Sequence, residues 1–148
     1  MLRRLALISA SILVGVAFAV PSASALQLPG FRSPSGNIRC FVLVGHSGDL
    51  LCTIAASDYA KTLQARCIGG GVGVDWHGFT LGATRRGALN CSGGIQYDPA
   101  DRLPTTTLAY GSTWRHGDFS CTSSRIGVTC RNHAGHGLFI SRASWRTW

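Results

Sequence analysis

The sequence of 148 residues contains no glutamate and only one lysine, Lys61. Its six acidic residues are all aspartates, and 13 of its 14 basic residues are arginines, so the formal net charge is +8. There are 19 glycines, many β-branched residues and little of the Ala/Glu/Lys/Leu patterning of long helices, which excludes a helix bundle or a coiled coil. With 45% hydrophobic and 14% charged residues, the composition is that of a folded chain rather than a disordered one.

The motifs of several enzyme classes are also missing. The chain has no Gly-x-Ser-x-Gly, which places the nucleophile of many serine hydrolases. The glycine cluster at 69–73 lacks the spacing of a dinucleotide-binding loop, and Lys61-Thr62 lacks the preceding glycines of a phosphate-binding loop. No two cysteines have the Cys-x₂₋₄-Cys spacing of zinc sites and redox motifs. We therefore expect no cofactor and no metal.

Residues 1–25 have the pattern of a secretory signal peptide. Two arginines precede an apolar stretch, Leu5–Val20, and the small residues Ala23 and Ala25 mark a cleavage site after residue 25. A membrane anchor is the alternative, but the apolar stretch is shorter than the ~20 residues of a spanning helix, and a proline follows it. We therefore expect a secreted protein, periplasmic or extracellular, whose mature chain is a single domain of residues 26–148.

The six cysteines all lie in the expected mature chain, and an even number of cysteines in an exported protein indicates disulfides. Two pairs of cysteines occur in strand-like segments that flank a turn, where a hairpin would bring the two members together. The third pair consists of the two cysteines that remain. The expected disulfides are Cys40–Cys52, Cys67–Cys91 and Cys121–Cys130.

Short strand-like segments separated by glycine-rich turns continue along the mature chain. Seven to nine such strands indicate a mainly β fold, an antiparallel sandwich or a small barrel braced by three disulfides. At most one short helix is expected, at 57–65, with Ser57 as a candidate N-cap. The expected strands are 37–44, 50–54, 74–76, 79–81, 88–91, 106–110, 119–122, 127–131 and 137–141.

The chain also has a weak internal similarity. The pattern Phe31-x-Ser33-x-Ser35-Gly36-x-Ile38-x-Cys40 is similar to the segment 119–130, which ends in Ile126-Gly127-Val128-Thr129-Cys130. Two interpretations remain open: a duplicated hairpin, or a coincidence between short segments.

Four stretches of the mature chain form a recognisable pattern. They are Phe31-Arg32-Ser33-Pro34-Ser35-Gly36-Asn37-Ile38-Arg39-Cys40; Cys67, Asp75-Trp76 and Cys91; Tyr110-Gly111-x-x-Trp114-x-x-Gly117-x-Phe119-x-Cys121; and Gly127-Val128-Thr129-Cys130-x-Asn132-x-x-Gly135-His136-Gly137-x-x-x-Ser141-Arg142. In this pattern the sequence resembles an uncharacterised family of small secreted bacterial proteins with a domain of unknown function. The resemblance covers nearly all of the mature chain. It implies secretion and a disulfide-braced domain, and it implies no activity.

The chain departs from that family at two places. A proline-rich stretch that usually precedes the third cysteine is replaced by residues 60–66. Where members often carry Cys-x-Gly-Asp, this chain has Cys91-Ser92-Gly93-Gly94. A site that used this aspartate would be missing here.

The excess of arginine suggests an anionic partner. Residues 26–148 carry 12 basic and 6 acidic residues, a formal charge of +6. Guanidinium groups bind phosphate and carboxylate and also stack on aromatic rings. An anionic polymer or glycan of the cell envelope is therefore a candidate partner, whereas nucleic acid is not expected; the alternative is an ordinary solvated surface. The candidate anion-binding residues are Arg85, Arg86, Arg142 and Arg146.

A small secreted hydrolase is a second hypothesis, and it needs acid and base groups that converge in one cleft. The alternative for such residues is a hydrogen bond to the backbone beside a turn. The candidates, all in the C-terminal half, are His116, Asp118, His133 and His136.

The aromatic residues have two roles to choose from, which are core packing and exposed stacking on sugar rings. We expect Trp114 and Phe119 in the core, and Trp145 and Trp148 exposed near the end of the chain.

The leading interpretation of the function is a non-enzymatic binding module at the cell envelope or outside it. The hydrolase and a structural envelope domain without a ligand are the alternatives.

Overall fold

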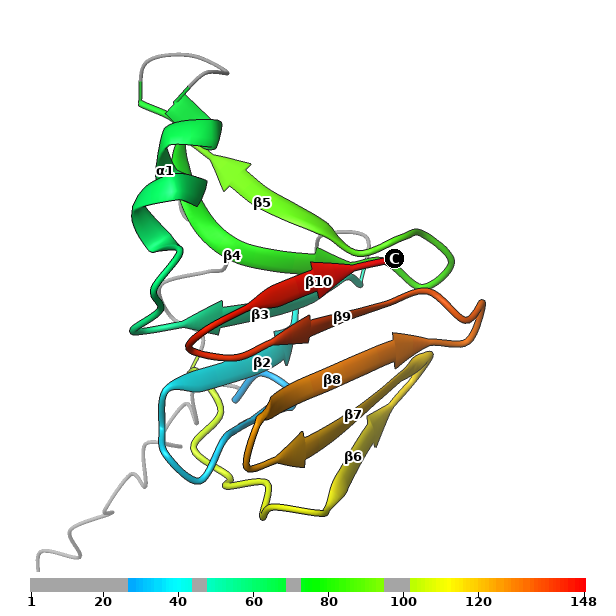
Figure 1. Ribbon diagram of the computed structural model, residues 1–148. Coiled ribbons are helices and arrows are strands. Elements are labelled where there is room, and N and C mark those ends of the chain that lie inside the picture. Colours follow the sequence, from blue (N-terminus) through cyan, green and yellow to red (C-terminus); the bar gives the residue numbers. More distant parts are fainter. Residues whose placement is uncertain (1–26, 44–47, 69–72, 95–101) are drawn as a thin grey trace, which may run out of the picture.

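The computed structural model describes residues 27–43, 48–68, 73–94 and 102–148, and the expected leader at 1–25 lies outside them. These residues form ten strands and one short helix. The strands make two antiparallel five-stranded sheets that pack face to face around a common core (Figure 1). The predicted mainly β fold is confirmed, and it is a sandwich because neither sheet closes into a barrel.

Sheet 1 contains the first five strands, and each strand pairs with the one that precedes it in the chain. Antiparallel neighbours need only tight connections, which suits the glycine-rich turns of the sequence. The connection between β3 and β4 is longer and carries helix α1 (Ala60–Ile68). The strands are β1 (Gly30–Arg32), β2 (Ile38–Val42), β3 (Leu50–Ile54), β4 (Asp75–Leu81) and β5 (Ala88–Ser92).

Sheet 2 contains the last five strands in the same consecutive order. The turn between β7 and β8 has two residues, Arg125-Ile126, because Ser124 pairs directly with Gly127. The strands are β6 (Thr113–His116), β7 (Phe119–Ser124), β8 (Gly127–Asn132), β9 (Gly137–Ile140) and β10 (Trp145–Thr147).

The two sheets have the same register around their disulfides. In each sheet, the cysteine of the second strand pairs with the cysteine of the third strand. An aromatic residue of the first strand pairs with the cysteine of the second strand. A large apolar residue of the fourth strand pairs with the cysteine of the third strand. In strand order these residues are Phe31, Cys40, Cys52 and Phe79 in sheet 1, and Trp114, Cys121, Cys130 and Leu138 in sheet 2.

The equivalent residues of the two sheets meet in the core. Cys52 Sγ lies 4.0 Å from Cys130 Sγ, so the two cross-strand disulfides touch between the sheets. At the edge of the sandwich, the rings of Phe31 and Trp114 pack with 5.4 Å between their centroids. Removal of this apolar surface from water is the main force that holds one sheet on the other.

The third disulfide, Cys67–Cys91, ties α1 to β5, so the structure joins the cysteines in the pairs expected from the sequence. The helix begins at Ala60 and not at residue 57, so Ser57 is not its N-cap. It continues to Ile68, beyond the expected end at residue 65, and buries Leu63 and Cys67. No helix in the described part of the chain is long and apolar enough to cross a membrane.

Several expected strand boundaries are wrong. Residues 106–110 are not a strand, because their pairing with sheet 1 is limited to an isolated bridge between Arg32 and Thr107. The segments expected at 74–76 and 79–81 form one strand, β4, whose pairing is irregular near Gly78. Gly78 has a φ of 108° and lies so close to β3 that a Cβ would collide with the Cys52 carbonyl. The short strands β1, β6 and β10 were not expected.

The aromatic residues also differ in part from expectation. Phe119 is 4% exposed, as expected for the core, and Trp114 is half-buried against the core. Trp145 is not an exposed terminal residue: it packs against Phe79 and Tyr59, with ring centroids 5.3 and 6.5 Å away. Strand β10 explains the difference, because pairing with β9 carries Trp145 over the core.

Candidate anion-binding surface

The outer face of sheet 1, which we call the covered face, is hidden by the protein's own chain. The segment before β1 lies beside the segment that follows residue 101, where the Leu28 N–H donates to the Arg102 carbonyl over 2.8 Å. Beneath them, Phe41 and Leu51 are each 1% exposed. The apolar cluster on this face consists of Leu28, Phe41, Leu43 and Leu51, with Leu103 packed against it.

The outer face of sheet 2 has polar residues at the equivalent positions. Thr122 and Thr129 pair with each other where sheet 1 has Phe41 and Leu51. Thr122 also shares a 3.0 Å hydrogen bond with the hydroxyl of Thr113 on β6. These side chains stay partly or fully exposed in the described structure. The open face, as we call it, consists of Thr113, Arg115, Ser120, Thr122, Thr129, Arg131, Phe139, Arg146 and Trp148.

Three arginines lie on alternate strands of the open face. Arg115 is on β6, Arg131 on β8 and Arg146 on β10, and all three are exposed. Neighbouring strands are about 4.8 Å apart, so alternate strands are about 10 Å apart. The five strands of sheet 2 contain no aspartate, and Asp118 in the β6–β7 turn is the nearest along the chain. The open face is therefore positively charged across its width.

Trp148 organises one end of the open face. The guanidinium carbons of Arg131 and Arg146 lie 5.1 and 4.9 Å from the centroid of its ring system, in cation–π contacts. The Trp148 ring lies against Gly137, where a Cβ would approach it to 2.5 Å. Its indole N–H donates to the Gly135 carbonyl over 3.2 Å. These contacts hold two cations side by side at a fixed place on the sheet.

A shallow depression of about 520 Å³ crosses the same face. Its lining combines an aromatic ring, a guanidinium and hydroxyls, which is a suitable mixture for sugar rings with charged substituents. Exposed apolar surface occurs at its edge, where Ile126 is 77% exposed. The lining residues are Ile126, Thr129, Phe139, Ser144, Trp145 and Arg146.

The four arginines proposed from the sequence do not form one site. Arg146 is on the open face, and Arg86 is beside Gly87, whose N–H donates to the Trp148 carbonyl over 3.4 Å. Arg85 forms a 2.6 Å ion pair with Asp49, which reduces its capacity to bind an anion. Figure 1 shows the β4–β5 loop that carries Arg85 and Arg86 beside the end of β10.

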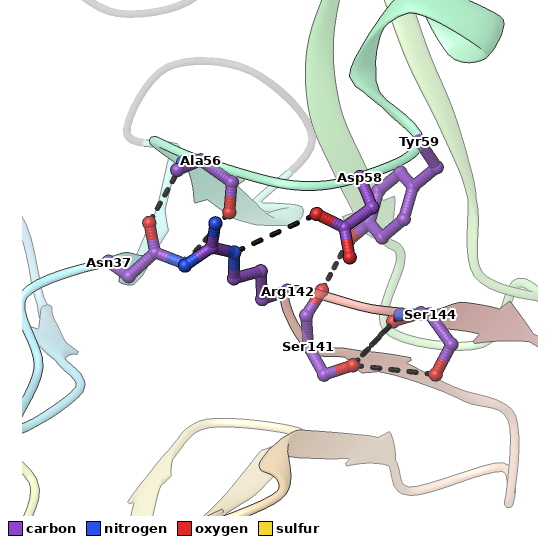
Figure 2. Close-up of polar contacts among 7 residues, drawn as sticks. All are labelled: Asn37, Ala56, Asp58, Tyr59, Ser141, Arg142 and Ser144. Carbon is purple, nitrogen blue, oxygen red and sulfur yellow. Dashed lines mark hydrogen bonds and ion pairs between the residues drawn. The ribbon is translucent and has the colours of Figure 1, made fainter.

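Arg142 lies at the opposite end of β9, in a junction between the two sheets (Figure 2). Its Nε is 3.7 Å from Asp58 Oδ1, and its carbonyl accepts the Asp58 N–H over 2.9 Å. The Tyr59 hydroxyl donates to the Ser141 carbonyl over 2.9 Å. Burial raises the pKa of Tyr59 to about 12, because the ionised phenolate would lose its hydration. The junction is therefore a fixed structural contact around an exposed arginine.

The four candidates for hydrolysis lie in two turns at the same end of sheet 2, two in each. His116 ends β6, Asp118 is in the β6–β7 turn, and His133 and His136 are in the β8–β9 turn. In the part of the chain that the structure describes, no hydrogen bond or ion pair joins any two of them. The His116 ring stacks on Trp114 with 5.8 Å between centroids. Nothing in this arrangement pairs an acid with a base.

One group of potential metal ligands lies together among the described residues, and it consists of Cys40, Cys52 and Cys130. All three sulfurs belong to disulfides. A disulfide sulfur is not the thiolate that binds a metal ion, so this group is part of the core.

Comparison with known sequences identifies the domain. The model of a family of unknown function, DUF6636, matches residues 10–147, which include both sheets and all six cysteines. The chain belongs to this family. The resemblance found in the sequence is confirmed, and the DUF6636 region of this chain folds as a disulfide-linked β sandwich. Comparison with curated proteins and with solved structures finds no match.

The alternation of residues around the cysteines of this DUF6636 domain is a sequence signal for the open face. In β8, Val128 and Cys130 alternate with Thr129 and Arg131. Because successive side chains of a strand point to opposite faces, a buried disulfide at Cys130 places Arg131 outside. By the same alternation, the buried Cys121 in β7 places the next residue, Thr122, on the outer face. No comparable signal marks Trp148, whose role depends on the pairing of the chain end with β9.

Proposed function

We propose that this protein is a secreted, non-enzymatic binding module that holds an anionic polymer or anionic glycan of the cell envelope on its open face. The observation that carries the proposal is the contrast between the two outer faces. One face is apolar and covered by the chain itself. The other presents arginines, hydroxyls and an aromatic ring to solvent, with no carboxylate on its strands.

The spacing of the cations favours a polymer over a single small anion. Arg115 and Arg131 each pair with Ser120 across neighbouring strands, so they lie in one row about 10 Å apart. Three guanidiniums at such separations suit a chain with regularly repeated charges, each bound through a forked contact. Hydroxyls between the arginines add hydrogen bonds to sugar or phosphate oxygens.

The pre-positioned guanidiniums favour binding further. An exposed arginine normally loses rotamer freedom when it binds, and this loss weakens the complex. Arg131 and Arg146 already rest on the Trp148 ring, so part of this loss occurs on folding.

The export of the protein is supported by the leader pattern and by the disulfides of all six cysteines, which persist in oxidising compartments.

The proposal is tested by retention of the oxidised protein on immobilised polygalacturonate, heparin and neutral dextran. We expect retention on the two anionic resins at 0.15 M salt and its loss near 1 M, where the screening length falls from ~8 to ~3 Å. Retention on dextran that resists salt would instead indicate recognition through the aromatic residues. Absence of retention on all resins would favour a structural domain without a ligand.

A matched pair of variants separates a specific face from general basicity. R115Q/R131Q removes two charges from the open face, and K61Q/R102Q removes two exposed charges from α1 and from the segment over the covered face. We expect retention at 0.15 M salt to fall at least tenfold in the first variant and less than twofold in the second. Equal losses in both variants would contradict the assignment of the open face.

A further inference from the structure

The two sheets separate at one end of the sandwich and leave a cleft of about 310 Å³ that the polymer proposal does not use. It lies between the β1–β2 turn, the β7–β8 turn and the segment after β9. We call it the end cleft. Its volume is at the lower limit for small-ligand sites, which have roughly 300–1,000 Å³. Ile38 and Val128, which are 5% and 1% exposed, form its apolar floor.

Two arginines from different elements line the end cleft, and no carboxylate does. Arg125 occupies the β7–β8 turn, and its guanidinium carbon lies 5.5 Å from the ring centroid of Tyr110, another lining residue. Arg142 belongs to the segment after β9. A pair of guanidiniums on two walls, above an apolar floor, is suited to an anionic group on a compact body.

The hydroxyls of the β1–β2 turn retain a hydrogen-bond donor. Ser33 Oγ accepts the Ile38 N–H over 3.1 Å, and Ser35 Oγ accepts the Asn37 N–H over 3.3 Å. The two hydroxyls share one hydrogen bond of 3.1 Å between them. Two hydroxyl protons are therefore present and only one is used, so one donor remains for a ligand.

Asn37 is also left with a donor. Its Oδ1 accepts the Ala56 N–H over 2.8 Å, and its Nδ2 donates to the Ala56 carbonyl over 3.0 Å (Figure 2). An amide nitrogen has two protons, and this pair of bonds uses one of them. The unused capacity of Asn37 and of the serine pair is thus donor capacity, which matches a ligand rich in acceptors.

The contact between Arg142 and Asp58 does not block the cleft strongly. Figure 2 shows the two side chains together, 3.7 Å apart at their nearest atoms. Their side chains are 77% and 65% exposed, and ion pairs between exposed side chains are weak because water screens them. The backbone around Arg142 is fixed by hydrogen bonds to Asp58 and Tyr59. The guanidinium can therefore exchange Asp58 for a ligand without a change in the fold.

We propose that the end cleft binds a sugar-sized ligand with one carboxylate or phosphate group, held between Arg125 and Arg142. The anionic group accepts hydrogen bonds from the guanidiniums and from the serine pair, and the body of the ligand rests on Ile38 and Val128. The end cleft and the depression on the open face share Ile126 but present different arginines, so this proposal does not depend on polymer binding.

The test is an NMR titration of the oxidised protein with glucuronate, glucose 6-phosphate and glucose. We expect saturable shifts of the Ser35, Gly127 and Ser141 amides with one or both anionic sugars and none with neutral glucose. The comparison of glucuronate with glucose 6-phosphate distinguishes the two anionic groups. Absence of saturable shifts in these amides would overturn the proposal, as would equal shifts with glucose.

Variants assign the site to its arginines. R125Q and R142Q are each expected to weaken binding at least tenfold, whereas D58N is expected to strengthen it about twofold because it removes the competing carboxylate. R115Q, on the open face, serves as the control and should leave the dissociation constant unchanged. Sensitivity to R115Q together with indifference to R125Q and R142Q would overturn the end cleft and leave the open face as the anion site.

Discussion

Sheet 1 and sheet 2 have the same strand order and the same cross-strand disulfide, yet their outer faces differ. In sheet 1 the outward row contains Phe41 and Leu51, which are buried under the chain's own segments. In sheet 2 the equivalent row contains Thr122 and Thr129, and it remains open to solvent. The inner faces show no such contrast, because both contribute disulfides and large apolar residues to a single core.

The comparison separates what is needed for stability from what is free for binding. An outward apolar row has to be covered, since a contiguous apolar patch that is exposed to water promotes association with other molecules. A row of threonines and arginines needs no cover, because its hydroxyls and guanidiniums are hydrogen-bonded by water. Sheet 2 therefore keeps a large surface available for a partner, and this is the basis for proposing that an anionic polymer binds there.

The largest expected effect tests the covered face against the open face. F41A and T122A truncate side chains at equivalent positions of the two sheets. We expect F41A to lower the free energy of unfolding by about 3–5 kcal/mol, since it leaves a cavity in a buried cluster. T122A should change it by no more than about 0.5 kcal/mol. Urea denaturation measures both, and similar losses in the two variants would break the comparison.

The second expected effect tests the equivalence of the two cross-strand disulfides. Their sequence separations are 12 residues for Cys40–Cys52 and 9 for Cys121–Cys130. Loop-closure entropy then assigns each of them about 3 kcal/mol. C40A/C52A and C121A/C130A should therefore lower the free energy of unfolding to a similar extent. A much larger loss in one variant would show that one sheet supports the other.

A third prediction sharpens the role of the open face. T122D/T129D places two carboxylates among the arginines without disturbing the core. We expect retention on heparin to fall about tenfold, equivalent to ~1.4 kcal/mol, with a change in unfolding free energy below about 1 kcal/mol. T122S/T129S is the control, since it keeps the hydroxyls and adds no charge. Unchanged retention of the aspartate variant would exclude this face as the binding surface.

The smallest expected effect concerns the junction between the sheets. The pKa of Tyr59 is about 12 in the fold and 10.0 as its ordinary value. The stabilising contribution of its neutral hydroxyl is therefore complete below pH 10 and is lost as the pH rises through 12. Between pH 9 and pH 11 the loss should stay below about 1.4 kcal/mol, because Tyr59 is partly exposed.

The measurement compares the urea midpoints of the wild type and Y59F at both pH values. Y59F lacks the titrating hydroxyl, so its stability should fall less than that of the wild type over this interval. Other tyrosines contribute equally to the two proteins and cancel in the difference. A steeper fall in Y59F than in the wild type would contradict the sign.

Local patterns predicted the hairpins well and the pairing of distant strands poorly. The Cys40–Cys52 and Cys121–Cys130 pairs could be predicted because each occurs within one hairpin, where the turn fixes the register. The internal similarity aligned Cys40 with Cys130 in the sequence. In the structure, Cys40 is instead equivalent to Cys121, because each is the cysteine of the second strand of its sheet. The resemblance of short segments had the wrong register because it did not include the neighbouring strands.

The candidate site shows the same division. Arg146 was among the four arginines proposed from the sequence, but Arg131 was not, because nothing local distinguishes it from the other arginines. Its importance depends on Trp148, which is 17 positions later in the chain and reaches it only through the pairing of β8, β9 and the chain end. Arg125 and Arg142 are brought to one cleft by the pairing of β8 with β9, which places the start of β8 beside the end of β9, and packing against sheet 1 adds the β1–β2 turn to that cleft.

The sequence by itself determined the class of this protein: a β domain of one family, with six cysteines in three disulfides and an excess of arginine. These properties depend on composition and on contacts within hairpins, so they can be read along the chain. Only the tertiary structure decided which face of each sheet is covered and which arginines lie together. Those outcomes depend on which sheet face packs against the other sheet and which is covered by other segments of the chain. These contacts join residues that are far apart in the sequence.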